Sequence, residues 1–286
     1  MKDLADANKI NLSYIGQGYN PAILPAVIAR NMLENPKWYT PYTPYQAEIA
    51  QGRLESLLNY QTMICELTGM DISNASLLDE ATSCAEAVSL AFAAAGNPSR
   101  NKCFISESIF PQNLDVIRTR CLGNGIELVV GKVLDFPWAE ADQFCGVLVQ
   151  NPDNIGNLTN FTEFFGKLRQ AGVRSILNSD ILSLCIVRSP AEMGADIAVG
   201  SVQRFGLPMG AGGPHPGYFA CKDDLKRKMP GRIIGISKDA DGNTALRMTL
   251  QVREQHIRRN KATSNICTSQ ALLANMVAMY GIWHTP

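Results

Sequence analysis

Short apolar runs alternate with helical segments through the middle of the chain, and this alternation limits the fold more than any other feature. Such runs are typical of buried strands, and the segments between them are long enough for helices that connect parallel strands. The sequence therefore predicts an α/β fold whose mainly parallel sheet is flanked by helices. The predicted strands are 102–105, 126–130, 145–150, 173–177 and 195–199, and the predicted helices are 25–33, 48–68, 81–95, 113–122, 161–170 and 268–280.

Residues 1–60 form an aromatic-rich opening that we expect to be an arm with helices, and residues 61–286 are expected to form one large domain. In the opening, the stretch from Trp38 to Gln46 carries several tyrosines and two prolines. The prolines disfavour a helix, and tyrosines this dense are unusual in a solvated linker. We predict an extended segment whose rings pack on a surface. Further on, a hairpin turn is expected at 239–243.

Charge and hydropathy exclude several classes of partner. Lys and Arg total 26, Asp and Glu total 26, and the formal net charge is zero, so no basic surface for nucleic acid is predicted. No apolar run approaches the roughly 18 residues of a membrane helix. The N-terminus resembles neither a signal peptide nor a transit peptide. These features favour the cytoplasm, or the mitochondrial matrix if the source is eukaryotic, and no association with a membrane.

Cysteine and histidine patterns indicate neither disulfides nor a metal site. The eight cysteines include no CxxC pair, and most lie in apolar contexts such as those of Cys145 and Cys185. We expect them to be reduced, buried side chains. The three histidines, one of them His215, lie far apart with no ligand-like spacing. A zinc site is therefore not expected.

Polar residues at two predicted strand ends point to a cofactor pocket. Asp180 follows one strand, and the sequence Gly-Ser-Val-Gln at 200–203 follows the next. Pyridoxal-phosphate enzymes with an aspartate-aminotransferase-like fold place an Asp against the pyridine nitrogen and a Lys on the aldehyde in this way. Ser83, near the start of a predicted helix, is a candidate for phosphate. However, Gln203 stands where the lysine is needed, and an amide cannot form a Schiff base.

Several long segments closely resemble the P-protein of the glycine cleavage system, the decarboxylating glycine dehydrogenase. Examples are YTPYQAE at 42–48, QRFGLPMG at 203–210 and MPGRIIG at 229–235. The other matching segments are 51–62, 74–82, 253–259 and 261–268. They occur in collinear order along nearly the whole chain. The resemblance is to the N-terminal half, or alpha subunit, of that enzyme.

This resemblance implies a fold type I pyridoxal-phosphate large domain that lacks its smaller terminal domain. The family enzyme decarboxylates glycine with pyridoxal phosphate and passes the aminomethyl group to the lipoyl arm of H-protein. Its cofactor lysine belongs to the other half, so Gln203 is the degenerate counterpart of that lysine. The implied partners are the lysine-bearing C-terminal half or beta subunit, lipoylated H-protein and glycine. An oligomer is expected, and the cofactor would not be bound covalently by this chain.

The same resemblance suggests which residues line or reach a pocket. Tyr42 and Tyr45 could reach the partner's cofactor pocket, or their rings could simply pack between the halves. Ser83, Asp180, Gln203 and His215 are the candidates for this chain's own degenerate pocket. Phe110 replaces a histidine that is common in the family, and the residues around Ser83 and Ala211 also differ. We therefore assign no phosphate binding to this half.

Two other functions are compatible with the sequence. One is a stand-alone pyridoxal enzyme that uses a lysine at another place, such as Lys222 or Lys261. The other is a non-catalytic scaffold that binds H-protein or an oligomeric neighbour.

Overall fold

A mixed sheet of seven strands forms the centre of the molecule in the computed structural model, which describes residues 1–9, 11–40, 42–250, 255–262 and 268–285. The spatial order is β1-β7-β6-β5-β4-β2-β3. The strands from β6 to β3 are parallel, and β7 and β1 add an antiparallel edge. The bounds are β1 Ile72–Ser73, β2 Lys102–Ser106, β3 Glu127–Gly131, β4 Phe144–Asn151, β5 Arg174–Ser179, β6 Ile197–Ser201 and β7 Gly217–Cys221.

Helices cover both faces of this sheet, as predicted. Along β4, Val147 and Val149 pack in a core with helices α3, α6 and α9, while Leu148 between them packs in a second core with α4 and α5. This alternation is the two-residue period of a strand that is buried on both faces. The helices are α3 Gln51–Thr68, α4 Glu80–Ala95, α5 Pro111–Asn124, α6 Thr162–Gln170, α7 Pro190–Met193, α8 Gln255–Arg258 and α9 Ala271–His284.

Local sequence signals explain where the main helices begin and end. Asp79 caps α4 by accepting a hydrogen bond from the Thr82 backbone N–H at 2.7 Å, and Gly96 ends the helix in the left-handed conformation. Pro111 occupies the first turn of α5, and Gly125 follows its last turn. All five predicted strands and all six predicted helices are present, with ends shifted by a few residues.

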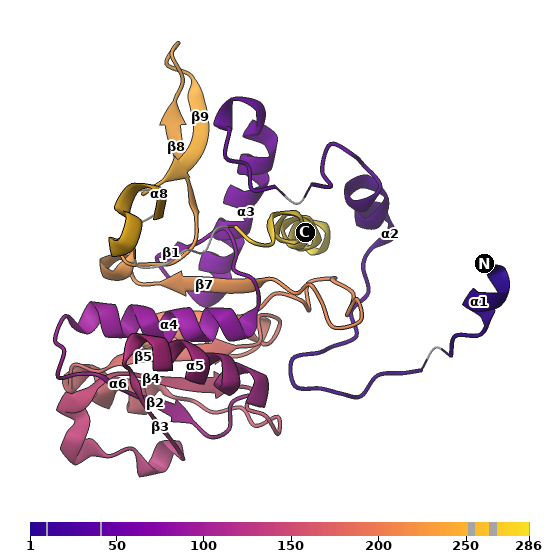
Figure 1. Cartoon of the computed structure of the whole chain (residues 1–286). Coiled ribbons are helices and arrows are strands. Elements are labelled where there is room, and N and C mark those ends of the chain that lie inside the picture. Colours follow the sequence, from indigo (N-terminus) through magenta and orange to yellow (C-terminus); the bar gives the residue numbers. More distant parts are fainter. Residues whose placement is uncertain (10, 41, 251–254, 263–267, 286) are drawn as a thin grey trace.

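Strands β1 and β7 were not predicted. β7 is a short buried strand between a glycine-rich loop and a charged segment, and β1 has only two residues. The expected turn at 239–243 is confirmed, because it joins β8 (Ile233–Lys238) to β9 (Thr244–Thr249) in a separate antiparallel hairpin. This hairpin projects away from the main sheet (Figure 1).

The N-terminal arm runs along the outside of the molecule. Helix α1 (Lys2–Asp6) lies away from the body (Figure 1). Helix α2 (Ala26–Ile28) packs near α9 and continues into a π-helical turn at Ala29–Leu33. Residue 60, the predicted division between arm and large domain, lies inside α3. The division of the chain there stays a prediction.

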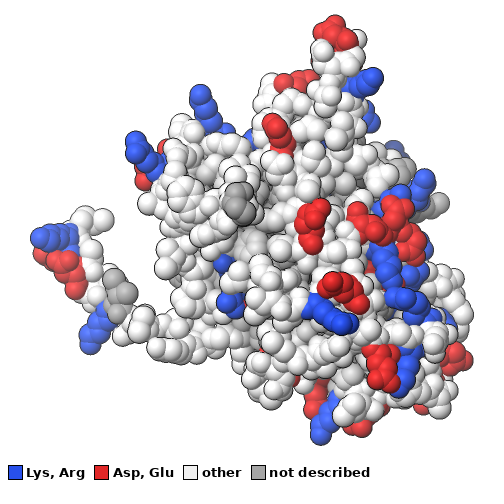
Figure 2. Space-filling model, turned by 180° about the vertical axis from the view of Figure 1, so that it is seen from behind, with Lys and Arg blue, Asp and Glu red and all other residues white. Residues whose placement is uncertain are grey.

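Surface properties agree in part with the sequence. No helix within the described ranges is both long and apolar enough to cross a bilayer. The face in Figure 2 carries basic and acidic side chains side by side, with large uncharged areas between them. Five of the seven described cysteines are buried, but Cys185 is exposed, so its predicted burial is wrong. Cys185 is the last residue of a short helical turn, Ser183–Cys185, after β5, where an apolar sequence context does not ensure burial.

Candidate functional site

The carboxyl ends of β4, β5 and β6 meet the first turn of α4 at one edge of the sheet. Two adjoining cavities, of about 200 and 230 Å³, lie there and share Gln17, Gly18, Glu80 and Ser201 in their walls. We call the first the Glu80 cavity; its wall includes Tyr19, Glu80, Asn113, Ser201, His215 and Gln270. The second, the Asp180 cavity, includes Asn20, Phe110, Asn178, Asp180 and Arg204.

Glu80 lies between the two cavities and binds two amide side chains. Its Oε1 accepts hydrogen bonds from Asn113 Nδ2 at 2.8 Å and from Asn178 Nδ2 at 2.7 Å. Burial raises the pKa of the Glu80 carboxyl, and the two hydrogen bonds lower it. The negative charges of Asp180 and Asp79 add to the upward shift of this pKa. The carboxyl therefore accepts a proton more readily than an exposed glutamate does.

Gln203 is completely buried, and its amide is fully used by backbone groups. Its Nε2 donates to the carbonyl oxygens of Leu207 at 2.6 Å and Asn20 at 2.8 Å, and its Oε1 accepts from the Asn20 N–H at 3.4 Å. Gln203 thus joins the end of β6 to the N-terminal arm. The residue at the predicted lysine position holds a piece of chain instead of a cofactor.

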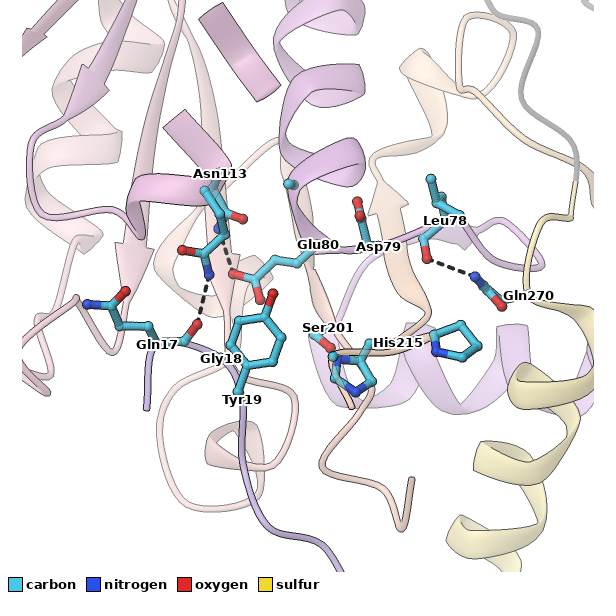
Figure 3. A pocket seen from close by; sticks show the side chains of 14 residues that line it. Gln17, Gly18, Tyr19, Leu78, Asp79, Glu80, Asn113, Ser201, His215 and Gln270 are labelled. Atoms are coloured by element: carbon cyan, nitrogen blue, oxygen red, sulfur yellow. Dashed lines mark hydrogen bonds between the residues drawn. The ribbon is translucent and has the colours of Figure 1, made fainter. Parts of the chain in front are cut away.

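The arm passes through the site at residues 17–20, as Figure 3 shows for Gln17, Gly18 and Tyr19. Gln112 Nε2 donates to the Gln17 carbonyl oxygen at 2.8 Å. Gly18 has φ +88°, and a β-carbon there would be 3.3 Å from both the Glu80 carboxylate and the Phe110 ring. The backbone therefore lies directly against Phe110 and Glu80. Tyr19 and His215 have ring centroids 5.7 Å apart.

Asp180 is at the predicted position, at the carboxyl end of β5, but it is already paired. Its Oδ2 accepts from Arg204 Nη1 at 2.7 Å, and its Oδ1 accepts from the Leu182 N–H at 2.9 Å. Its side chain is one of the partly exposed groups of the cavity wall. A charge-assisted contact of this kind competes with any other partner for the carboxylate.

His215 lines the Glu80 cavity, whereas Ser83 lines neither cavity. The His215 ring is bonded through Nε2 to the Met209 carbonyl oxygen at 3.0 Å. Ser83 is fully buried inside α4 and donates its hydroxyl hydrogen to the Asp79 carbonyl oxygen at 3.0 Å. A phosphate at the start of this helix would instead meet the carboxylates of Asp79 and Glu80.

Tyr42 and Tyr45 lie apart from both cavities, on the arm. Their exposed fractions are 73% and 57%, so in this chain their rings do not pack on a surface as predicted; the buried residue of the segment is Thr43. Thr43 donates to the Thr268 carbonyl oxygen at 3.1 Å. The Tyr45 ring has the Arg232 guanidinium 5.6 Å from its centroid. These hydroxyls remain available to a neighbouring protein.

Pyridoxal phosphate does not fit the residues of this site. The nucleophilic lysine is missing, the Gln203 amide is fully bonded, and residues 17–20 of the arm form part of the cavity walls. Lys222 is not a substitute for that lysine. Its Nζ lies 2.7 Å from Asp196 Oδ1, and Asp196 immediately precedes β6. This ion pair is therefore at the opposite edge of the sheet from Asp180. The side chain of Lys261 lies outside the described residues.

Sequence reasoning missed the residues that make this site distinctive. Glu80, Asn113 and the arm at 17–20 come from three separate parts of the chain. Gly16-Gln17-Gly18 reads as an ordinary turn, and the structure does show a turn there, closed by a bridge between Gly16 and Tyr19. The sequence did contain one indication of this site. Asp79 and Glu80 form an acidic pair at the start of a helix, and a helix N-terminus that binds phosphate would not carry acidic side chains there.

The whole chain, residues 1–286, matches the family model of the glycine cleavage system P-protein. It is 52% identical to a glycine dehydrogenase (decarboxylating) of Christiangramia forsetii over 290 residues, and 55% identical to that of Photobacterium profundum over 286. A mitochondrial glycine dehydrogenase (decarboxylating) of Flaveria anomala is 55% identical over 289 residues. The chain is fully covered in each case but spans only 28% to 30% of these relatives.

Solved structures give the same relationship. A crystal structure of glycine decarboxylase (P-protein) of the glycine cleavage system, in inhibitor-bound form, has a TM-score of 0.92 and 38% identity; the match covers all of this chain and 65% of that one. A cysteine desulfurase from Thermococcus onnurineus is 12% identical with a TM-score of 0.59, which shows a shared fold only. The predicted fold type I architecture is confirmed. The chain belongs to the glycine cleavage system P-protein family.

Proposed function

We propose that this chain is the supporting half of a glycine-decarboxylating P-protein. In the complete enzyme, a lysine-bearing half would hold pyridoxal phosphate, decarboxylate glycine and pass the aminomethyl group to the lipoyl arm of H-protein. This chain would contribute structure and surface to that site and perform no covalent chemistry itself. The family match over residues 1–286 supports the choice of enzyme.

Gln203 is the single observation that carries the assignment of a supporting role. A Schiff base needs a nucleophilic amine, which an amide lacks. The Gln203 amide is also engaged on both sides, with Leu207 and with Asn20 of the arm. The site that would hold a cofactor thus serves to fix the arm. The tyrosine segment has its own attachment, because the Arg53 side chain donates to the Tyr42 carbonyl oxygen at 3.1 Å.

The exposed side of the arm supports a partner-facing role for that segment. Large apolar or aromatic side chains there include Tyr39, Tyr42, Tyr45 and Ile49, which are 50%, 73%, 57% and 79% exposed. Aromatic residues are enriched where proteins meet, because they combine large apolar area with a hydroxyl that can be paired. We assign this surface to contact with the lysine-bearing half.

Glycine–bicarbonate exchange tests the proposed division of labour. The chain is assayed alone, the lysine-bearing half alone, and both after co-expression, each with lipoylated H-protein and pyridoxal phosphate. We expect exchange to require both halves, or to be at least tenfold faster when both are present. A tenfold change in rate corresponds to about 1.4 kcal/mol in the barrier. Exchange by this chain alone would overturn the proposal. Binding of H-protein by this chain without any effect on exchange would favour the scaffold function.

A further inference from the structure

A larger cavity lies beside the site described above, at the carboxyl ends of β2 and β4. Its volume is about 560 Å³, more than twice that of the Glu80 cavity or the Asp180 cavity. Ser106 is the last residue of β2, Gln150 is near the end of β4, and both line this cavity. We call it the Trp138 cavity. Small-molecule sites of α/β proteins lie at this edge of the sheet, and most have volumes of about 300 to 1,000 Å³.

The rings that line the Trp138 cavity belong to an aromatic cluster that extends into the core. Trp138, Phe161 and Phe164 are in the cavity wall. The Trp138 ring meets Phe136 and Phe164 edge to face, with centroids 4.7 and 5.7 Å apart, and Phe136 is buried. Trp138 is nevertheless 41% exposed. A large ring that its neighbours hold in place and that remains accessible offers a preformed apolar surface to a flat ligand.

The uncompensated charge in the wall is positive. Two lysines and two acids line the cavity, Lys132 and Lys167 with Asp153 and Glu163. Lys167 Nζ lies 3.4 Å from Glu163 Oε1. The Asp153 carboxylate accepts hydrogen bonds from the Asn157 N–H and Nδ2 at 2.9 and 3.0 Å. Among the described residues, no carboxylate lies within ion-pair distance of the Lys132 ammonium group. Lys132 is therefore free to pair with an anion.

The aromatic surface and the free ammonium group together select the class of ligand. A ring on the ligand can pack on Trp138, and a negative charge can pair with Lys132. One ammonium group matches the single charge of a carboxylate. The hydroxyls of Ser108 and Thr159, also in the wall, have no hydrogen-bond partner within the described ranges and can donate to the same group. A cation would instead meet carboxylates that are already in use.

We propose that the Trp138 cavity is a binding site for a small aromatic carboxylate. The ring of the ligand would lie against Trp138, and its carboxylate would pair with Lys132. The cavity shares Gln150 and Asp153 with the Asp180 cavity but contains neither Asp180 nor Gln203. Because the ligand would touch none of the residues that carry the proposed function, the site holds whether or not that function is correct.

Isothermal titration of the 286-residue chain with indole-3-acetate tests this site. Indole-3-acetamide has the same ring and shape without the charge, and sodium acetate has the charge without the ring. We expect saturable binding of indole-3-acetate, at least threefold weaker binding of the amide, and no saturable binding of acetate. Absence of saturable indole-3-acetate binding, or equal binding of the amide, would overturn the proposal.

Variants locate the site. Lys132→Gln should weaken indole-3-acetate binding at least threefold and leave the amide unaffected. Lys238→Gln removes the same charge from an exposed lysine at the end of β8, and as the matched control it should change neither ligand. Trp138→Leu should weaken both ligands at least threefold, because the ring contact is lost. Lys132 is exposed, so its variant is expected to fold and decides the test if Trp138→Leu does not fold. Undiminished indole-3-acetate binding by Lys132→Gln, or by a folded Trp138→Leu, would contradict the assignment.

Discussion

At the scale of single residues, the most informative position is Gln203. Its lack of a nucleophile is readable from the sequence, but its partners are not, because Asn20 lies 183 positions away. The same holds for Asp180: its place at a strand end was predicted, while its pairing with Arg204 depends on how two loops meet. Local patterns predict which residue types stand at a site, and long-range packing decides what each one binds.

Replacing Gln203 by Ala should loosen the arm. The change leaves the buried carbonyl group of Leu207 and the partly buried one of Asn20 without their donor, which should cost about 1 to 3 kcal/mol in the free energy of unfolding. Urea unfolding measures this cost, and limited proteolysis at residues 10–25 reports release of the arm. Gln112→Ala removes one exposed bond to the same arm and should cost less than about 1 kcal/mol. Equal stability of wild type and Gln203→Ala would contradict the role of Gln203.

Introducing lysine at position 203 should not create a cofactor site. In Gln203→Lys the Asp180 carboxylate remains paired with Arg204, and Asp79 and Glu80 remain where a phosphate would bind. We expect no absorbance band of a pyridoxal aldimine when the variant is mixed with pyridoxal phosphate. An aldimine band that disappears on borohydride reduction would show that the pocket still accommodates the cofactor.

The raised pKa of Glu80 predicts a pH dependence of stability with a defined sign. Burial raises this pKa above the ordinary value of 4.5, so the folded protein binds the proton more tightly than the unfolded chain does. As pH rises above about 4.5, wild type should lose stability relative to Glu80→Gln, until pH exceeds the folded pKa of Glu80. Urea unfolding of both proteins between about pH 4 and 8 measures the difference.

Glu192 provides the control of opposite sign. Hydrogen bonds from the Ser189 backbone and hydroxyl lower the pKa of its carboxyl below 4.5. Its contribution is therefore present above that value and is lost as pH falls through the folded pKa. Relative to Glu192→Gln, wild type should gain stability as pH rises toward about 4.5 and change little above it, so this pair is also measured below pH 4. A pH trend for Glu80→Gln with the same sign as that for Glu192→Gln would contradict the account of Glu80.

At the scale of elements, the parallel part of the sheet and its helices were predictable, and the antiparallel edge was not. The strands β2 to β6 are apolar runs joined by helices, so short-range periodicity identifies them. β7 has only five residues, and its direction depends on its pairing with β6 after a long loop. β1 is two residues that become a strand only because β7 lies beside them.

The contact between β7 and the start of α4 should not tolerate a side chain at position 217. A β-carbon on Gly217 would collide with the Asp79 carbonyl oxygen and the Ser83 hydroxyl, and a backbone atom cannot move aside cheaply. Gly217→Ala should lower the free energy of unfolding by about 1 to 3 kcal/mol. Gly166→Ala, inside α6 with open space around it, should raise it by up to about 1 kcal/mol. Chemical denaturation of both variants checks the pair, and an unaffected Gly217→Ala would refute this packing.

At the scale of the whole molecule, the chain is an α/β layer structure in which residues 17–20 of the arm line two cavities at the carboxyl edge of the sheet. The family and the fold type were predictable because long collinear segments carry them. The position of the arm against these cavities was not predictable, because residues 17–20 read only as a turn and its neighbours. The chain spans about 30% of its curated relatives, and the proposed supporting role places the covalent chemistry in the remaining part.

Borohydride trapping with peptide mapping tests the central claim most directly. The two halves are co-expressed, supplied with pyridoxal phosphate, reduced with borohydride and digested, and the pyridoxyl-lysine is located by mass spectrometry. We predict that all of the label lies on a lysine of the partner half and none on this chain. A pyridoxyl group on Lys222, Lys261 or any other lysine of this chain would contradict the account.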